Sequence, residues 1–120
     1  MARYEHLPIF MKAYDLTLHI EKVVAGFSRY NKYTLGSELR DRTRKVLEMI
    51  IRGNNTNDRL QILLDLRVEL EVFKVFTRLC HESHAFKSRK SYFFIAEWIT
   101  DIIGQNEGWI KKTRSRKNKE

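Results

Sequence analysis

Four segments of the chain repeat apolar residues at spacings of three and four, the period of an α-helix with one buried face. The repeats run from Ile9 to Phe27, from Leu35 to Ile50, from Leu60 to Leu79 and from Tyr92 to Ile103. Only five glycines and one proline interrupt the 120 residues, which argues against an all-β fold with many tight turns. The pattern predicts an all-α fold, an antiparallel up-down-up-down four-helix bundle.

Local signals predict where these helices begin and end. Pro8 suits a first helical turn, and Thr34 is predicted to cap the second helix. Gly53 is expected to end the second helix in a left-handed conformation. Asp58 and Gln61 have the spacing of a capping box for the third. The third helix is expected over about residues 59–82 and the fourth over about 88–105.

The last ten residues, 111–120, have no apolar side chain with which to pack. They contain six basic residues and one acidic residue, and so hold +5 of the formal net charge of +8. We therefore expect a bundle domain over residues 1–110 and a disordered, flexible basic tail over residues 111–120. The positive net charge predicts attraction to polyanions such as nucleic acid.

Several classes of site are not expected. The single cysteine, Cys80, allows no intrachain disulfide and no thiolate metal site. His81 and His84 lack the spacing of a zinc protease motif, and no glycine-rich phosphate loop is present, so neither a metal nor another cofactor is predicted. The first ten residues do not resemble a signal peptide, and no apolar run approaches the roughly 18 residues of a membrane span. These features predict a cytoplasmic protein without a membrane partner.

The third helix offers a candidate nucleic-acid surface. Arg67, Lys74 and Arg78 fall within about 40° of one another on a helix. Such a stripe of cations can follow a phosphate backbone. Glu71 lies in the same stripe, however, so a solvated face of ion pairs is the other interpretation. The sequence leaves both interpretations open.

The second helix and the tail add further basic candidates. Arg40 and Arg44 share a face, and Arg40 has no acidic residue three or four positions away, which leaves it open to a phosphate. Arg42 lies at the edge of the apolar stripe, where it either extends toward water or faces a neighbouring subunit or partner. The tail cations favour affinity without sequence selectivity. They are Lys111, Lys112, Arg114, Arg116 and Lys117.

Several short strings together resemble one known family. They are Leu7-Pro8-Ile9-Phe10, Tyr14-Asp15-Leu16, Tyr30-Asn31-Lys32-Tyr33-Thr34-Leu35-Gly36, Leu39-Arg40-Asp41, Arg52-Gly53-Asn54 and Gly108-Trp109-Ile110. The likeness covers about residues 4–112, and the string that ends at Gly36 is the most specific. The chain resembles the accessory variability determinant proteins of diversity-generating retroelements. These belong to a wider four-helix-bundle family that includes proteins encoded by ribosomal RNA intervening sequences.

The resemblance implies a basic homopentamer that binds the reverse transcriptase of the element together with template RNA and possibly DNA. Such a complex makes mutagenised complementary DNA from a template repeat. The resemblance also implies that this chain is not itself the polymerase, and we expect no enzymatic activity.

Two alternative functions remain. Arg78 and His84 have a spacing similar to that found in the helical ribonucleases called HEPN domains, in which the histidine assists attack by the 2′-hydroxyl group. Leu79 departs from that pattern, because those nucleases favour a polar residue after the arginine. The other alternative is a generic RNA-associated bundle protein of the wider family, with no retroelement role.

Overall fold

The computed structural model describes residues 3–119, and the side chains of residues 4–118. It contains the 3-10 helix η1 (Arg3–His6) and the α-helices α1 (Pro8–Ala25), α2 (Arg29–Lys32), α3 (Leu35–Asn55), α4 (Leu60–Glu82) and α5 (Arg89–Lys119). No strand occurs between residues 3 and 119, so the prediction of an all-helical fold with four long helices is confirmed. Within this range, no helix has both the length and the apolar character that crossing a membrane requires.

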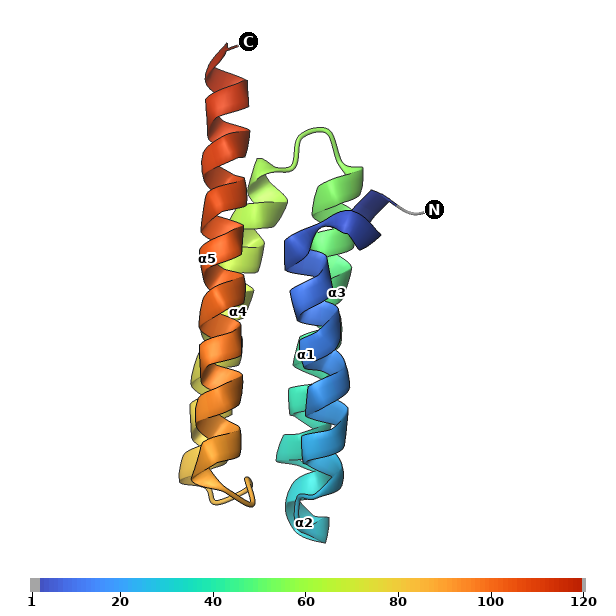
Figure 1. Ribbon diagram of the computed structural model, residues 1–120, viewed down its shortest axis with the longest axis vertical. Helices are drawn as coiled ribbons and strands as arrows, with labels where there is room; N and C mark the ends of the chain where they lie inside the picture. Colours follow the sequence, from blue (N-terminus) through green and yellow to red (C-terminus); the bar gives the residue numbers. More distant parts are fainter. Residues whose placement is uncertain (1–2, 120) are drawn as a thin grey trace.

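The four long helices lie side by side along a molecule of 53 × 28 × 20 Å (Figure 1). Helix α1 packs on α3, α3 on α4, and α4 on α5, while α1 also contacts α5. In Figure 1 the α3–α4 connection lies at one end of the molecule, and α2 and the α4–α5 connection lie at the other. Helix α5 extends past the α3–α4 connection, so the C-terminal end of α5 projects beyond the other helices.

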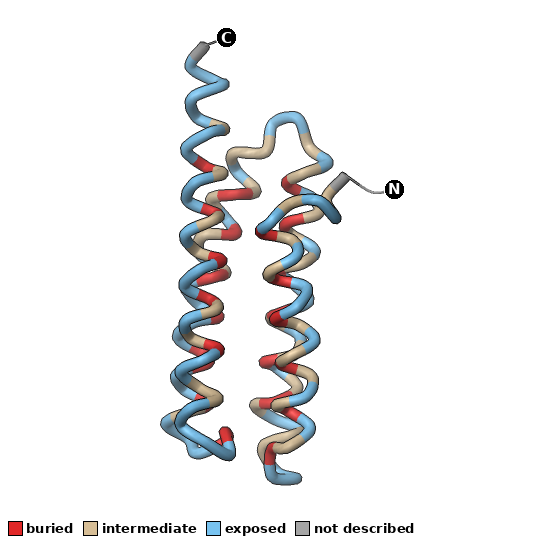
Figure 2. Tube along the Cα trace, in the orientation of Figure 1, coloured by how far each residue is buried: buried red, intermediate tan, exposed pale blue. Residues whose placement is uncertain are grey.

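The core is built from one buried stripe on each long helix, and the buried positions recur along each of them (Figure 2). The largest side chains with almost no exposed surface are Leu16, Ile20, Leu39, Ile50, Leu63, Leu66, Leu70, Phe73, Ile95, Ile99, Ile102 and Ile110. This burial supplies most of the favourable free energy of folding, since the transfer of apolar surface out of water is the main force that drives folding. The presence of Ile110 shows that α5 remains part of the core well beyond the predicted end of the fourth helix.

Two glycines of α3 are explained by close helix packing. A Cβ atom at Gly36 would lie 2.6 Å from Val24 Cγ1 of α1, so only glycine allows the two helices to meet there. Gly53 was expected to end α3 in a left-handed conformation, and that prediction is wrong, because α3 continues to Asn55 and no glycine among the described residues has a positive φ. A Cβ atom at Gly53 would instead lie 3.1 Å from Leu63 Cδ2 of α4.

The ends of α4 also differ from the prediction. The expected capping box is absent, because α4 starts after Arg59 without a side-chain cap, and Gln61 donates a hydrogen bond to Asp65. At its other end, His84 has φ +63°. The His84 N–H group donates to the His81 carbonyl, and the Ala85 N–H group donates to the Cys80 carbonyl. This is a Schellman motif, which ends the helix by pairing carbonyl groups that would otherwise lack a donor.

The structure also differs from the prediction of a flexible tail over residues 111–120. Residues 111–119 continue α5 as a helix, and Glu120 lies outside the described residues. Lysine and arginine are good helix formers, and nothing after Gly108 interrupts the backbone hydrogen bonds. A solvated helix needs no buried face when it extends one that is already anchored by Ile110. The expected boundary at residue 110 therefore falls inside a continuous helix.

Candidate nucleic-acid interface

The predicted stripe on α4 is divided by an ion pair between helices. The Arg67 guanidinium donates two hydrogen bonds to Glu107 of α5, from Nε to Oε2 at 2.8 Å and from Nη2 to Oε1 at 2.7 Å. These hydrogen bonds raise the pKa of Arg67 and lower the pKa of Glu107. Because a bidentate pair of this kind fixes the guanidinium plane, Arg67 joins α4 to α5 and is poorly placed to bind phosphate.

The other two cations of the stripe remain exposed. Within residues 4–118, Lys74 and Arg78 form no ion pair, and neither does Glu71. The alternative interpretation is therefore met only at Arg67, which pairs with Glu107 of α5, and the pairs expected with Glu71 are absent within residues 4–118. A pair of cations on one helix is a smaller electrostatic surface than the predicted row of three.

The cations expected on α3 both contact one carboxylate of α1. Arg44 Nη2 lies 2.7 Å from Glu21 Oε1, and Arg40 Nη1 lies 3.8 Å from Glu21 Oε2. Arg44 also lies 3.8 Å from Asp41 on its own helix. Arg40 was expected to have no acidic partner because only its own helix was considered. Both residues are present where predicted, but neither is a free cation.

Arg42 contacts three residues of its own chain. Its Nε atom donates to Glu38 at 3.0 Å, and its Nη1 atom donates to Glu69 of α4 at 3.2 Å. The guanidinium carbon lies 5.2 Å from the centre of the Phe76 ring, within the range of a cation–π contact. Arg42 thus lies at the edge of the core with its charge paired, and a contact with a neighbouring subunit or partner stays a prediction.

Exposed cations gather on the projecting part of α5. At 100° per residue, Lys111, Lys112, Arg114, Arg116 and Lys117 are distributed around the whole circumference of the helix. All five are exposed, and the one ion pair they form within residues 4–118 joins Lys117 Nζ to Asp58 at 3.8 Å. This segment therefore presents positive charge in every direction.

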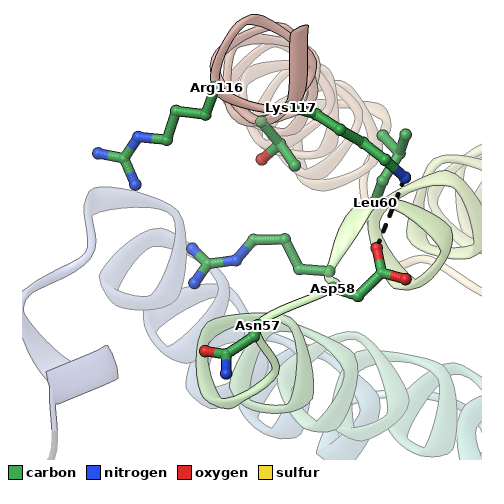
Figure 3. Close-up of a pocket in the computed structure, with 7 residues that line it drawn as sticks. Asn57, Asp58, Leu60, Arg116 and Lys117 are labelled. Carbon is green, nitrogen blue, oxygen red and sulfur yellow. Dashed lines mark ion pairs between the residues drawn. The ribbon is translucent and has the colours of Figure 1, made fainter. Parts of the chain in front are cut away.

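A cavity of about 560 Å³ lies between this part of α5 and the start of α4 (Figure 3). Figure 3 shows Asn57 from the α3–α4 connection across from Arg116 of α5, with the pair of Asp58 and Lys117 at one side. The cavity is lined by Asn57, Asp58, Arg59, Leu60, Thr113, Arg116 and Lys117. Three of these residues are basic and one is acidic, so the cavity suits an anionic group.

Arg59 was not predicted as a site residue. Its Nε atom donates to the Thr56 carbonyl at 3.3 Å, and its guanidinium carbon lies 5.8 Å from the centre of the Trp109 ring. These contacts hold a half-buried cation beside Arg116, which comes from α5. Nothing in the sequence around Arg59 predicts the proximity, because it depends on α5 continuing as a helix past residue 110. We call Arg59 and the five α5 cations together the cationic end.

The residues considered for catalysis or metal binding, His81, His84 and Cys80, differ in their surroundings. His84 is exposed in the left-handed turn after α4, while the His81 ring stacks on Tyr92 with centroids 4.2 Å apart. Cys80 is buried, and this burial raises the pKa of its thiol to about 12. Within the described residues, no group of three metal-binding side chains is present.

Comparison with protein-family models and with curated protein sequences found no match.

Proposed function

We propose that this chain is an accessory factor of a diversity-generating retroelement. In this role it binds the reverse transcriptase together with template RNA, and possibly DNA, and supports synthesis of mutagenised complementary DNA in the cytoplasm. The family resemblance of the sequence supports this proposal. A reverse transcriptase gene and paired variable and template repeats are expected beside its gene.

The observation that best supports nucleic-acid binding is the cationic end. Its five α5 cations face solvent on a helix that projects beyond the bundle, and among them only Lys117 has a carboxylate partner within residues 4–118. Arg40, Arg44 and Arg67, by contrast, are engaged with carboxylates. Phosphate binding by cations without acidic partners releases condensed counterions and requires no ion pair to be broken. We therefore place the main interface at the cationic end, with Lys74 and Arg78 as a lesser surface.

We also propose that the chain forms a homopentamer of antiparallel up-down-up-down bundles. The resemblance supplies the number five. The structure supports self-association, since large apolar side chains remain about half exposed on α1 and α5 as well as on α4. On α1 these side chains are Met11, Tyr14 and Leu18, and on α5 they are Phe93 and Phe94.

Replacing Arg59 and Arg116 together by glutamine is expected to weaken binding of single-stranded RNA. If both guanidinium groups contact phosphate, the plot of log affinity against log salt should flatten by about 1.4, at about 0.7 for each contact. Fluorescence anisotropy over a series of salt concentrations measures both quantities. A matched control replaces Arg44 and Arg52, which are paired with Glu21 and Glu48, and removes the same net charge. An equal loss in both double variants would show that only net charge matters.

We propose no catalytic role for the chain. Incubation with single-stranded RNA, with and without divalent metal, is expected to leave the RNA intact. Cleavage that disappears in both His84→Ala and Arg78→Ala would instead support the ribonuclease alternative, in which His84 assists attack by the 2′-hydroxyl group and Arg78 stabilises phosphate charge.

A further inference from the structure

Helix α4 carries a second apolar stripe that points away from the core. Val68, Val72, Val75 and Leu79 are 61%, 38%, 53% and 48% exposed, although the opposite face of the same helix is fully buried. We call these four residues the α4 seam. Exposed apolar side chains scattered singly need no explanation, but four in one row along a helix form a continuous surface.

The α4 seam has the spacing of a coiled coil. Its residues are separated by four, three and four positions, which is the alternation of a and d positions in a heptad repeat. Val72, Val75, Phe76 and Leu79 line a groove of about 440 Å³ beside Arg42. Four residues in this arrangement form the hole that receives one side chain of a facing helix. The surface is therefore shaped for another α-helix.

The charges beside the α4 seam favour one particular helix as the occupant. Four charged residues line the same groove. Arg42 is paired within the chain and Glu82 lies at the end of α4, whereas Glu71 and Arg78 are one heptad apart, at the g positions. When two copies of such a helix pair in antiparallel fashion, g positions face g positions, so each Glu71 meets the partner's Arg78. In a parallel pair, these residues would face Phe76 and Ser83, which offer no opposite charge.

We infer that the α4 seam binds the α4 seam of a second copy of this chain, antiparallel and about a twofold axis. Val72 then packs against the partner's Val75, and Val68 against the partner's Leu79. The contact is isologous, so each pairing occurs twice. Arg78 is thereby removed from the nucleic-acid surface and becomes an assembly residue, while Lys74 stays on the outer side of the helix.

This inference rests on the proposed self-association but not on RNA binding or a retroelement role. A twofold contact cannot close a ring of five subunits. If other surfaces hold the proposed pentamer together, the α4 contact joins two such rings face to face; if they do not, it forms a dimer. Its effect on mass is the same in either case: loss of the α4 contact halves the mass of the assembly.

Charge exchange across the α4 seam provides the test. In Glu71→Arg, two arginines would face each other at both ends of the contact, and the mass at micromolar concentration, measured by light scattering, should fall by half. Adding Arg78→Glu restores opposite charges and should restore the mass. Glu48→Arg makes the same charge change at an exposed position of α3, a helix without large exposed apolar side chains, and should leave the mass unchanged.

Val72→Asp is the second variant, since it places a charge at the centre of the apolar contact and should raise its dissociation constant at least about tenfold. Circular dichroism of each variant confirms that the bundle is folded.

An unchanged mass in both Glu71→Arg and Val72→Asp would overturn the inference. So would a loss of mass in Glu71→Arg that the double variant fails to restore, because the α4 seam would then face a different surface or another protein. A wild-type mass near 14.4 kDa would contradict this contact and the pentamer together. A wild-type mass of five chains would overturn this contact alone, and a mass of two chains would contradict the pentamer alone. RNA binding at the cationic end is measured separately.

Discussion

Truncation after Lys112 is expected to weaken binding of every single-stranded nucleic acid by at least about tenfold at low salt. The deletion removes four basic residues, Arg114, Arg116, Lys117 and Lys119. If each contacts one phosphate, the plot of log affinity against log salt should flatten by about 3. The loss should be similar for different sequences, because phosphate contacts carry no base information. Titrations of two unrelated RNA strands over a range of salt concentrations measure both effects.

A full-length variant with glutamine at the same four positions separates charge from shape. It should lose as much affinity as the truncated chain, because glutamine preserves helix propensity while removing the cations. Joint replacement of Arg67, Lys74 and Arg78 should change the slope less, since Arg67 is held by Glu107. An unchanged slope after truncation would mean that the part of α5 after Lys112 does not contact phosphate.

Phe73→Ala is expected to lower the free energy of unfolding by about 3–5 kcal/mol. Phe73 is 1% exposed in the middle of α4 and belongs to the main core cluster, so its loss leaves a cavity that rigid neighbouring helices cannot fill. Tyr30→Ala is the matched control, because Tyr30 is 79% exposed on α2, outside the surfaces proposed for self-association. The control should cost less than about 1 kcal/mol. Urea unfolding followed by circular dichroism measures both, and equal losses would contradict the central place of Phe73 in the core.

Helical periodicity predicted the four long helices because each buries one continuous stripe. It was less informative about helix ends, where the outcome depends on packing between helices. Gly53 looks like a helix terminator in the sequence, yet it is needed inside α3 because Leu63 and Trp109 approach its Cα atom. The segment after Ile110 looks unable to fold, yet it continues a helix that the core already holds.

The sequence predicted that basic residues form the candidate site, but it did not predict which of them have acidic partners on other helices. Intrahelical spacing identifies acidic partners on the same helix, so it could not reveal that Glu21 of α1 pairs with Arg40 and Arg44. The pairing of Arg67 with Glu107 of α5 could not be predicted for the same reason. Arg59 became a candidate only through its position beside Arg116. Ion pairs between helices therefore decide which cations remain available for a ligand.

The burial of Cys80 has a consequence for the chemistry of the assembled protein. Since thiolates, not thiols, react with oxidants and alkylating agents, a pKa of about 12 leaves almost none of the reactive form near neutral pH. The sulfur atom also lies inside the core, where no reagent reaches it while α4 stays in place. Oxidation therefore cannot join the subunits of any assembly through a disulfide without unfolding them first. Loss of the free thiol would record each opening of the core, which makes this cysteine an internal reporter of global unfolding.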